Sequence, residues 1–343
     1  MPTSSVGPTV GILANPASGR DIRRLVAQAS VFQTAEKSNM VARTMAGLGA
    51  VGVTRAFMMP DLGGIAGGVN RAIQIHDNMS VDPWPVMTFL DMEIEQAPID
   101  TLRAVDMMIE AGAAAIVVLG GDGTNRLVAS VCGEIPMMPL STGTNNVFPA
   151  LREATIAGLA AGLVATGRVD VATGCRRNKV LRVALNGETR DLALVDLCVS
   201  GELHVGSRAL WKADSLEELF VCFAEADAIG LDSIAGLIRP IGRDDAIGLR
   251  LRLGEPDGAP RVVTAPIGPG LIAPVGVYEV AELHPGQPVA LSTRQGVIAL
   301  DGEREIEFSP EDRIEVRLER NGPLTVDIDR VMRHAAEAGL LAV

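Results

Sequence analysis

Several features that mark other classes of protein are missing from this sequence of 343 residues. Its four cysteines, Cys132, Cys175, Cys198 and Cys222, are widely spaced, with no Cys-x-x-Cys pair and no histidine at ligand spacing. We therefore expect reduced, mostly buried thiols rather than disulfide partners or zinc ligands. The four histidines are scattered too, so the sequence gives little support to a histidine-based nucleophilic triad.

An excess of positive charge is also absent, because 30 lysines and arginines stand against 42 aspartates and glutamates, which gives a net charge of −12. Nucleic-acid binding needs a basic face that displaces counterions, so the composition argues against a nucleic-acid partner. It argues equally against docking on anionic lipid. Only local basic groups such as Arg20 and Arg126 could bind an anionic substrate. Arg126 is the favoured candidate for this contact, because it lies one turn behind Asp122.

No apolar run is long enough for a membrane helix, and the first residues lack the pattern of a signal peptide. We therefore expect a cytoplasmic protein without integral membrane contact. The sequence has no Gly-x-x-x-x-Gly-Lys-Ser/Thr loop, so a P-loop fold is unsupported. Gly47-x-Gly49-x-x-Gly52 matches a dinucleotide fingerprint, but it follows a helical stretch and precedes a strand, which is the reverse of the required order.

What the sequence does contain is three stretches typical of anion sites, each directly after a short apolar run that predicts a buried strand. They are residues 15–19, 120–124 and 141–146. A strand, a glycine turn and a helix aim backbone N–H groups and the positive end of a helix dipole at an anion. In an open parallel sheet the three turns would meet at the edge where ligands bind. The pattern therefore predicts a phosphate site.

The middle stretch carries a carboxylate, Asp122. A carboxylate beside phosphates is unfavourable unless a metal ion lies between them or the carboxylate takes a proton from an attacking hydroxyl. Both are roles found in kinases. The alternative is an ordinary turn with Asp122 as a helix N-cap, but that turn would need neither the preceding glycine pair nor the two similar turns elsewhere.

The motif Gly120-Gly121-Asp122-Gly123-Thr124 resembles the signature of the superfamily that joins NAD kinases with diacylglycerol and sphingosine kinases. Asn15 to Gly19 and Pro139 to Asn145 resemble two loops of its lipid-kinase branch, and Asp301-Gly302-Glu303 resembles that branch's Asp-Gly-Glu motif. Residues 193–200 and 206–212 resemble the branch of ATP-NAD/AcoX kinases, named after acetoin catabolism protein X.

One departure from the NAD kinase pattern bears on the substrate. Where NAD kinases carry an Asn-Asp or Asn-Glu pair that holds the dinucleotide, this chain has Val195-Asp196. The acid is kept and the amide is lost, so the resemblance favours a small-molecule kinase more strongly than it favours NAD as the substrate.

The resemblance implies an NAD kinase/diacylglycerol kinase-like fold: an α/β Rossmann-like N-terminal domain with a parallel sheet, then an all-β C-terminal domain. The residues agree, because strands alternate with helices to about residue 165 and short strands broken by turns follow. We expect a nucleotide-binding domain of residues 1–165 plus 325–343, and a β-rich acceptor and oligomerisation domain of residues 166–324. A homo-oligomer assembled through the β-rich domain is implied by the resemblance.

Some segments allow two interpretations. Residues 61–68 hold two glycine pairs and form either a wall or lid of the site, or a plain loop; the stretch from about 69 to 96 is expected to be an insertion. Asn186-Gly187 between two alternating runs predicts a hairpin. Without the resemblance, Asp301-Gly302 would also be interpreted as a hairpin turn.

The expected activity is ATP-dependent phosphoryl transfer to a small hydroxyl acceptor, with Mg²⁺ bridging the phosphates. The resemblance implies the 2′-OH of the adenosine ribose of NAD as acceptor, giving NADP. The residues expected to bind ATP are Asn15, Ser18, Gly19, Gly120, Gly121, Gly123, Thr124, Asn125, Arg126, Thr142, Gly143 and Thr144.

Asp122 is expected to orient or deprotonate the accepting hydroxyl, with Glu303 as a second catalytic group. The other expected site residues are the acceptor contacts Asn145, Asn146 and Asp196 and the metal ligand Asp301. Two other functions stay open. One is a lipid or polyol kinase of the diacylglycerol kinase type, and the other is a nucleotide-binding accessory protein linked to acetoin catabolism without turnover.

Overall fold

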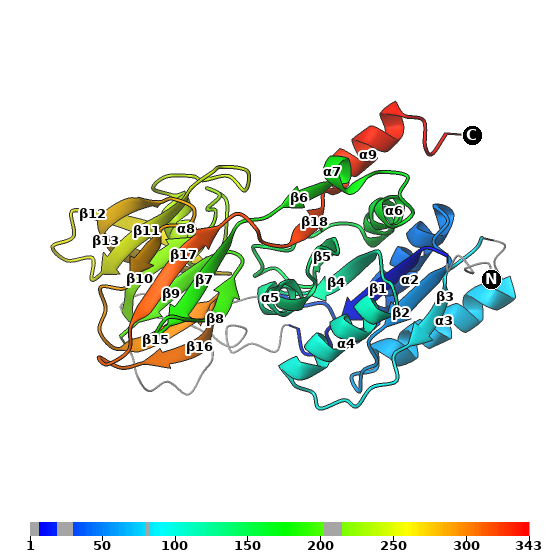
Figure 1. The fold of residues 1–343 in the computed structure, drawn as a ribbon, viewed down its shortest axis with the longest axis horizontal. Coiled ribbons are helices and arrows are strands. Elements are labelled where there is room, and N and C mark those ends of the chain that lie inside the picture. The colour runs from blue at the N-terminus through cyan, green and yellow to red at the C-terminus, as the bar shows by residue number, and fades with distance from the viewer. Residues whose placement is uncertain (1–6, 19–29, 80–81, 202–214, 343) are drawn as a thin grey trace.

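The computed structural model of the chain describes residues 7–18, 30–79, 82–201 and 215–342 (Figure 1). These residues form an α/β body and a β-rich body that lie side by side. The first contains a largely parallel sheet covered by helices, and the second contains antiparallel sheets. The fold class predicted from the sequence is therefore confirmed.

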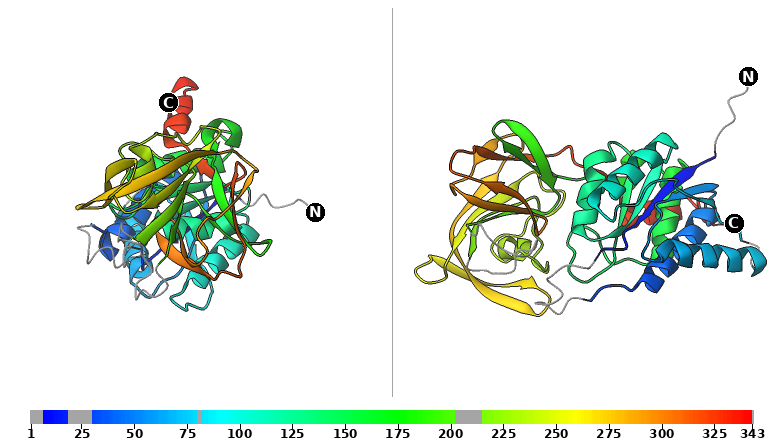
Figure 2. Two further views of the ribbon diagram at one scale, coloured as in Figure 1. Left: turned by 90° about the vertical axis from the view of Figure 1, so that its left-hand side faces the viewer. Right: turned by 90° about the horizontal axis from the view of Figure 1, so that it is seen from below.

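The sheet of the α/β body contains β1 (Thr9–Ala14), β2 (Arg55–Met58), β3 (Val86–Phe89), β4 (Ala115–Gly120), β5 (Met137–Ser141), β6 (Cys175–Arg177) and β18 (Leu324–Val326). Their spatial order is β3-β2-β1-β4-β5-β18-β6, and neighbours run parallel except for the antiparallel pair β18 and β6. The order reverses direction between β1 and β4, where open α/β sheets bind ligands. In the view from below, the carboxyl end of β1 faces the β-rich body (Figure 2).

Helices cover both faces of this sheet: α2 (Thr34–Ala50), α3 (Ile65–Met79), α4 (Pro98–Glu110), α5 (Asp122–Val131), α6 (Ala154–Ala165), α7 (Val171–Gly174) and α9 (Ile328–Glu337). Alternate residues of β4 pack on opposite faces. Ile116 and Val118 share an apolar cluster with residues of α4 and α5, whereas Val117 and Leu119 share one with α2 and α6. Because both faces are covered, β4 is buried along its whole length.

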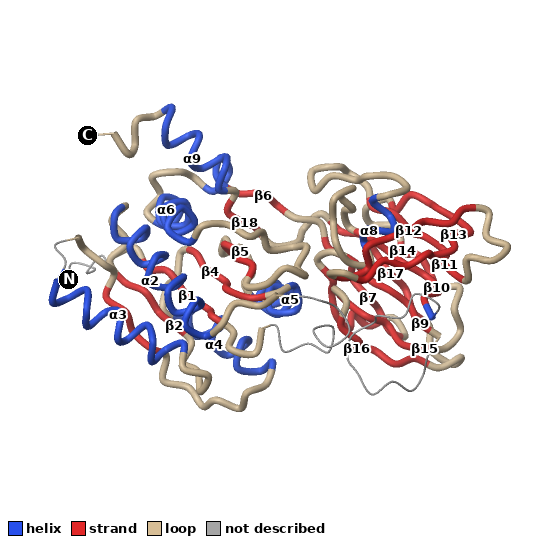
Figure 3. Tube along the Cα trace, turned by 180° about the vertical axis from the view of Figure 1, so that it is seen from behind, coloured by secondary structure: helices blue, strands red, loops and turns tan. Residues whose placement is uncertain are grey.

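The β-rich body contains the short helix α8 (Asp232–Gly236) and eleven strands (Figure 3). They are β7 (Val180–Leu185), β8 (Glu188–Ala193), β9 (Asp196–Ser200), β10 (Leu216–Val221), β11 (Gly248–Gly254), β12 (Arg261–Gly268), β13 (Leu271–Leu283), β14 (Pro288–Ala290), β15 (Gly296–Leu300), β16 (Glu303–Phe308) and β17 (Ile314–Glu319). The strand orders of its sheets are β12-β13-β11-β10-β9-β15-β16 and β14-β17-β7-β8. Leu181 and Val316 of the smaller sheet cluster with Phe220 and Ile298 of the larger one, which buries the inner faces of both.

Two tight turns agree with the sequence. Asn186 and Gly187, with φ of 54° and 89°, connect the paired strands β7 and β8, so the predicted hairpin is confirmed. Asp301 and Gly302, with φ of 50° and 79°, connect β15 and β16 in the same way. The hairpin interpretation of Asp301-Gly302 is therefore correct, and it places Glu303 at the start of β16.

The chain returns to the α/β body near its end. Strand β18 joins the parallel sheet, and α9 packs against α6 and α7. Strand β6 also belongs to this sheet, although the expected boundary at residues 165 and 166 assigned it to the β-rich domain.

Residues 69–96, expected to be an insertion, supply most of α3 and the edge strand β3. Within the described ranges no helix is long and apolar enough to cross a bilayer.

The close packing of α2 on α6 leads to a stability prediction. A Cβ added at Gly158 would lie 2.3 Å from the carbonyl oxygen of Thr44, whereas one added at Gly67 in α3 would meet nothing within 4 Å. We expect Gly158→Ala to destabilise the protein by about 1–3 kcal/mol, because backbone must move. Gly67→Ala, the matched control, is expected to be neutral or to stabilise by up to about 1 kcal/mol. Urea unfolding measures both, and equal effects would contradict the packing argument.

Candidate functional site

A cavity of about 790 Å³ opens at the carboxyl ends of β1, β2, β4 and β5. Loops of the α/β body form most of its wall, and Asp191, Glu303 and Glu305 of the β-rich body close one side. The predicted site residues that line it are Asn15, Ser18, Gly121, Asp122, Gly123, Thr124, Arg126, Thr142, Gly143, Thr144, Asn145, Asn146 and Glu303. All three predicted loops therefore meet at one cavity.

Four predicted site residues do not line this cavity: Gly120, Asn125, Asp196 and Asp301. Gly120 ends β4, and Asn125 donates a hydrogen bond from its side-chain nitrogen to the carbonyl oxygen of Gly121, at 2.9 Å. Asp196 is buried at the start of β9. Gly19 and the stretch 206–212 lie outside the described residues.

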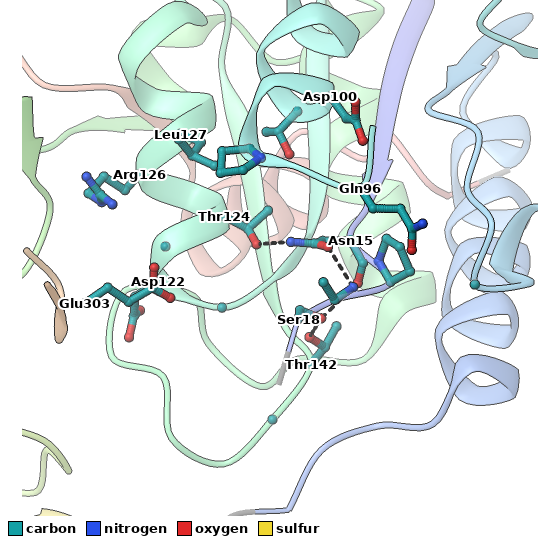
Figure 4. Close-up of a pocket in the computed structure, with 18 of the residues that line it drawn as sticks. Asn15, Ser18, Gln96, Asp100, Asp122, Thr124, Arg126, Leu127, Thr142 and Glu303 are labelled. Carbon is teal, nitrogen blue, oxygen red and sulfur yellow. Dashed lines mark hydrogen bonds between the residues drawn. The ribbon is translucent and has the colours of Figure 1, made fainter. Parts of the chain in front are cut away.

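Hydrogen bonds between side chains hold the three loops together (Figure 4). The Asn15 amide nitrogen donates to Thr124 Oγ1 at 2.9 Å, which ties the first loop to the start of α5. The hydroxyls of Ser18 and Thr142 lie 2.9 Å apart and tie the first loop to the third. The Asn15 amide oxygen also accepts the backbone N–H of Ala17, at 2.8 Å. These contacts fix the directions of the loop backbones before any ligand binds.

Lys37 is a buried lysine that holds the first loop by hydrogen bonds, and sequence reasoning missed it. Lys37 of α2 is 2% exposed, and its Nζ donates to the carbonyl oxygens of Asn15 and Ser18 at 3.0 and 3.1 Å and to Ser18 Oγ at 2.7 Å. A lysine ordinarily suggests a solvated position. The signal was its spacing, because Lys37 precedes the buried Val41 and Met45 by four and eight residues and so lies on the buried stripe of α2.

The glycines of the second loop allow close packing around the start of α5. A Cβ at Gly120, Gly121 or Gly123 would lie 2.6 Å from Thr124, 2.8 Å from Asn146 or 2.9 Å from Glu303, respectively. The start of α5 is therefore closely bounded by Asn146 of the third loop and by Glu303 of the β-rich body. A helix N-terminus of this kind favours anions.

Asp122 does not cap its own helix, so the N-cap alternative is wrong. Gly121 holds the N-cap position without a side-chain hydrogen bond, and the carboxylate of Asp122 accepts the backbone N–H groups of Val147 and Phe148 at 2.8 to 3.2 Å. Arg243 of the β-rich body donates to the carbonyl oxygens of the same two residues, at 2.7 and 3.2 Å. The 147–148 segment is thus held from both sides.

Glu303 lies beside Asp122 (Figure 4). Mg²⁺ in kinases is commonly held by one or two carboxylates together with the oxygens of substrate phosphates. Two adjacent carboxylates fit this requirement in the presence of a polyphosphate. The described residues contain no group of three or more aspartates, glutamates, histidines or cysteines that would hold a metal ion without such a ligand.

Arg126, expected to meet the nucleotide, is engaged by the β-rich body. Its guanidinium pairs with Asp191 at 2.7 Å and Glu305 at 2.5 Å, and the residue is 4% exposed. Burial opposes the charge, but the carboxylates of Asp191, Asp301 and Glu305 outweigh it and raise the arginine pKa. The pairing connects α5 to the β-rich body, and any contact of Arg126 with a phosphate competes with it.

Asp301 is bound to backbone rather than turned into the cavity. Its carboxylate accepts the N–H groups of Leu194, Val195 and Asp196 at 2.8 to 3.3 Å. Its burial, opposed by the charge of Arg126, raises the pKa to about 7. These bonds give Asp301 a role in placing the turn before Glu303, and its role as a metal ligand remains a prediction.

A second buried acid near Asp122 was not found from the sequence. Asp232 begins α8 and is fully buried, and neither carboxylate oxygen has a hydrogen-bond partner among the described residues. Burial, and next the charge of Asp122, raise the Asp232 pKa to about 8. Asp232 is therefore protonated at neutral pH, as expected for a buried acid near another carboxylate.

The contacts of Lys37 predict a structural effect focused on the first loop. Lys37→Met removes a charged donor shared by two carbonyls and a hydroxyl, although Ser18 still donates to the Asn15 carbonyl, so we expect a loss of about 1–3 kcal/mol. We also expect faster hydrogen exchange at the amides of Ala17 and Ser18. Arg71→Met on α3 is the exposed control. Unchanged exchange in the first loop would show that Lys37 does not hold it.

The protonation of Asp232 predicts a pH-dependent stability. Between its ordinary pKa of 3.8 and about 8, the unfolded chain loses the proton that the folded protein keeps, so the unfolding free energy falls as pH rises. We expect Asp232→Asn to gain stability relative to the parent protein over this interval, and the difference to level off at higher pH. Urea unfolding at a series of pH values measures it, with exposed Asp227→Asn as control. Parallel curves would contradict the assignment.

Comparisons with known proteins agree with this geometry. Residues 10–169 match the ATP-NAD kinase N-terminal domain, and residues 179–321 match the acetoin catabolism protein X C-terminal domain. The chain is 44% identical over 344 aligned positions to acetoin catabolism protein X of Cupriavidus necator, covering 99% of this chain and 95% of that relative. The resemblance inferred from the motifs is thereby confirmed, and the chain belongs to the acetoin catabolism protein X family, with an N-terminal domain of the ATP-NAD kinase type.

Proposed function

We propose that the protein is an ATP-dependent kinase of a small hydroxyl acceptor, with the 2′-OH of the adenosine ribose of NAD as the first candidate. The observation that carries the proposal is the meeting of the three anion-binding loops with the Asp122 and Glu303 carboxylates in one cavity. The match of residues 10–169 to the ATP-NAD kinase N-terminal domain supports the same class of reaction.

The polyphosphate of ATP would lie on the loop backbones. The first N–H groups of α5 would supply donors, and the helix dipole adds a favourable field. The hydrogen bonds of Asn15 with Thr124 and of Ser18 with Thr142 keep these donors in place. Preorganised donors stabilise the charge that spreads over the transferred phosphoryl group.

In this proposal Asp122 acts as the base, and both carboxylates take part in holding the metal ion. The Asp122 carboxylate is oriented by the amides of Val147 and Phe148, so it presents a fixed oxygen to the accepting hydroxyl and takes its proton. Glu303, with Asp122, would hold Mg²⁺, which when bound neutralises phosphate charge. Asn145 and Asn146 line the cavity and are the proposed acceptor contacts, while Asp196 would need a rearrangement to reach it.

A second candidate is a nucleotide-binding accessory protein without turnover. The name of the Cupriavidus necator relative associates that protein with acetoin catabolism. The cavity also carries the carboxylates of Asp61, Asp100, Asp122, Asp191, Glu303 and Glu305, which oppose a polyphosphate unless cations accompany it. A cytoplasmic location and a homo-oligomer formed through the β-rich body remain predictions.

The kinase proposal is tested by NADP formation from NAD and Mg-ATP. We expect Asp122→Asn to lose roughly two orders of magnitude or more in rate, because the proton acceptor is removed. Asp106→Asn, an exposed position on α4, is the charge-matched control and is expected to keep full activity. Full activity in Asp122→Asn would eliminate the base role. No NADP from the parent protein, with ATP still bound in equilibrium dialysis, would favour another acceptor or the accessory function.

A further inference from the structure

The cavity has a second part that the phosphate loops do not explain. Figure 4 shows Gln96 and Asp122 on opposite sides of the hydrogen bond between Asn15 and Thr124. Asp122, Glu303 and Arg126 belong to the charged side. The other side is formed by the segment between β3 and α4 and by the loop after β2, neither of which belongs to the three loops proposed to bind phosphate.

The wall on the Gln96 side is mostly apolar. Its apolar lining residues are Met59, Pro60, Leu62, Ile94, Ala97 and Pro98. The two acids that also line it are engaged by backbone. Asp100 accepts the N–H groups of Glu95 and Ala97 at 3.0 and 3.3 Å, and Asp61 accepts those of Ile65 and Ala66 at 3.1 and 2.6 Å.

Gln96 is the side chain of this wall that offers an unused amide. It is exposed to the cavity, and its side chain makes no hydrogen bond within the described part of the chain. An amide presents one acceptor and two donors in a single plane. Such a group pairs with the edge of a nucleobase through two parallel hydrogen bonds.

The backbone holds Gln96 in a conformation that is unusual for a residue with a side chain. Its φ is 57°, in the left-handed region. The N–H groups on either side of it, those of Glu95 and Ala97, are both bound by Asp100, and Pro98 then starts α4. Residues kept in strained conformations by their surroundings concentrate at ligand sites. The side chain is therefore presented to the cavity by a rigid turn.

We infer that this wall is a base-binding subsite, and that Gln96 is a specificity-determining residue that reads the base edge of ATP. The inference rests on the proposed function, which places the phosphates on the glycine loops. A planar base has apolar faces and a polar edge, and the wall offers apolar side chains around one amide. The acidic side of the cavity is unsuited to a base and suited to a cation-bound polyphosphate.

The test compares ligands with and without a base. Dissociation constants of ATP, GTP and inorganic tripolyphosphate, each with Mg²⁺, are measured by calorimetry for the parent protein, Gln96→Ala and Gln96→Glu. Glu93→Ala, an exposed position in the same loop, is the control. We expect Gln96→Ala to weaken ATP about tenfold, as for one or two lost hydrogen bonds, and to leave tripolyphosphate unchanged.

The Gln96→Glu variant tests base recognition through the ratio of ATP to GTP affinity. A purely structural role of Gln96 would not change this ratio. A carboxylate accepts but does not donate, so it favours guanine, which presents neighbouring donors, and we expect the ratio of ATP to GTP affinity to fall. An unchanged ratio together with unchanged ATP binding in Gln96→Ala would overturn the inference. Equal weakening of ATP and tripolyphosphate would also overturn it, because the effect would then lie in the phosphate loops.

Failure of the inference and failure of the proposed function are distinguishable. If the parent protein binds tripolyphosphate as tightly as ATP, the base makes no contact and the subsite is wrong while the nucleotide site stands. The dissociation constant of NAD is measured for the same variants, and a loss confined to NAD would assign the wall to the acceptor and overturn the assignment to ATP. If neither ATP nor tripolyphosphate binds, the proposed function itself is wrong, and the subsite falls with it.

Discussion

The two-sided hold on residues 147 and 148 is the interaction on which the site depends. Asp122 accepts their N–H groups from the α/β body, and Arg243 donates to their carbonyl oxygens from the β-rich body. The Arg243 guanidinium also stacks 4.1 Å from the ring centroid of Phe223. One peptide segment therefore connects the turn after β4, the loop after β5 and the second body. Satisfied polar networks of this kind fix geometry, since each member depends on the others.

The buried cations Lys37 and Arg126 are bound to groups of the protein itself rather than held free for a ligand phosphate. Lys37 gathers the carbonyl oxygens of the first loop, and the N–H groups of Ala17 and Ser18 are bound within the same loop by Asn15. Arg126 is paired with two carboxylates of the β-rich body. The cavity that results carries more acid than base, so the binding of a polyphosphate there depends on accompanying cations.

Local patterns predicted those parts of the fold that local physics determines. The strand, glycine turn and helix around residues 115–131 and the Asn186-Gly187 hairpin are set by burial periodicity and by the need for positive φ. The sequence did not reveal the roles of Lys37 and Asp232, because lysine and aspartate ordinarily indicate solvated positions. The hydrogen-bond partners of Lys37 are distant in sequence, and the Asp232 carboxylate has none among the described residues. Strand β6 was not predicted, and the expected boundary placed its residues in the β-rich domain, because a three-residue strand leaves almost no periodic signal.

The sequence by itself determined the fold class, the three loops and the presence of Asp122 among them, because each follows from motifs within a few residues. Only the tertiary structure decided which acids face the cavity. It brought Glu303 beside Asp122, turned Asp301 to the amides of residues 194–196, and moved Arg126 into ion pairs across the two bodies. The physical reason is that a charged side chain is placed by the cost of leaving it unpaired when buried, and its partners come from strands that only folding brings together.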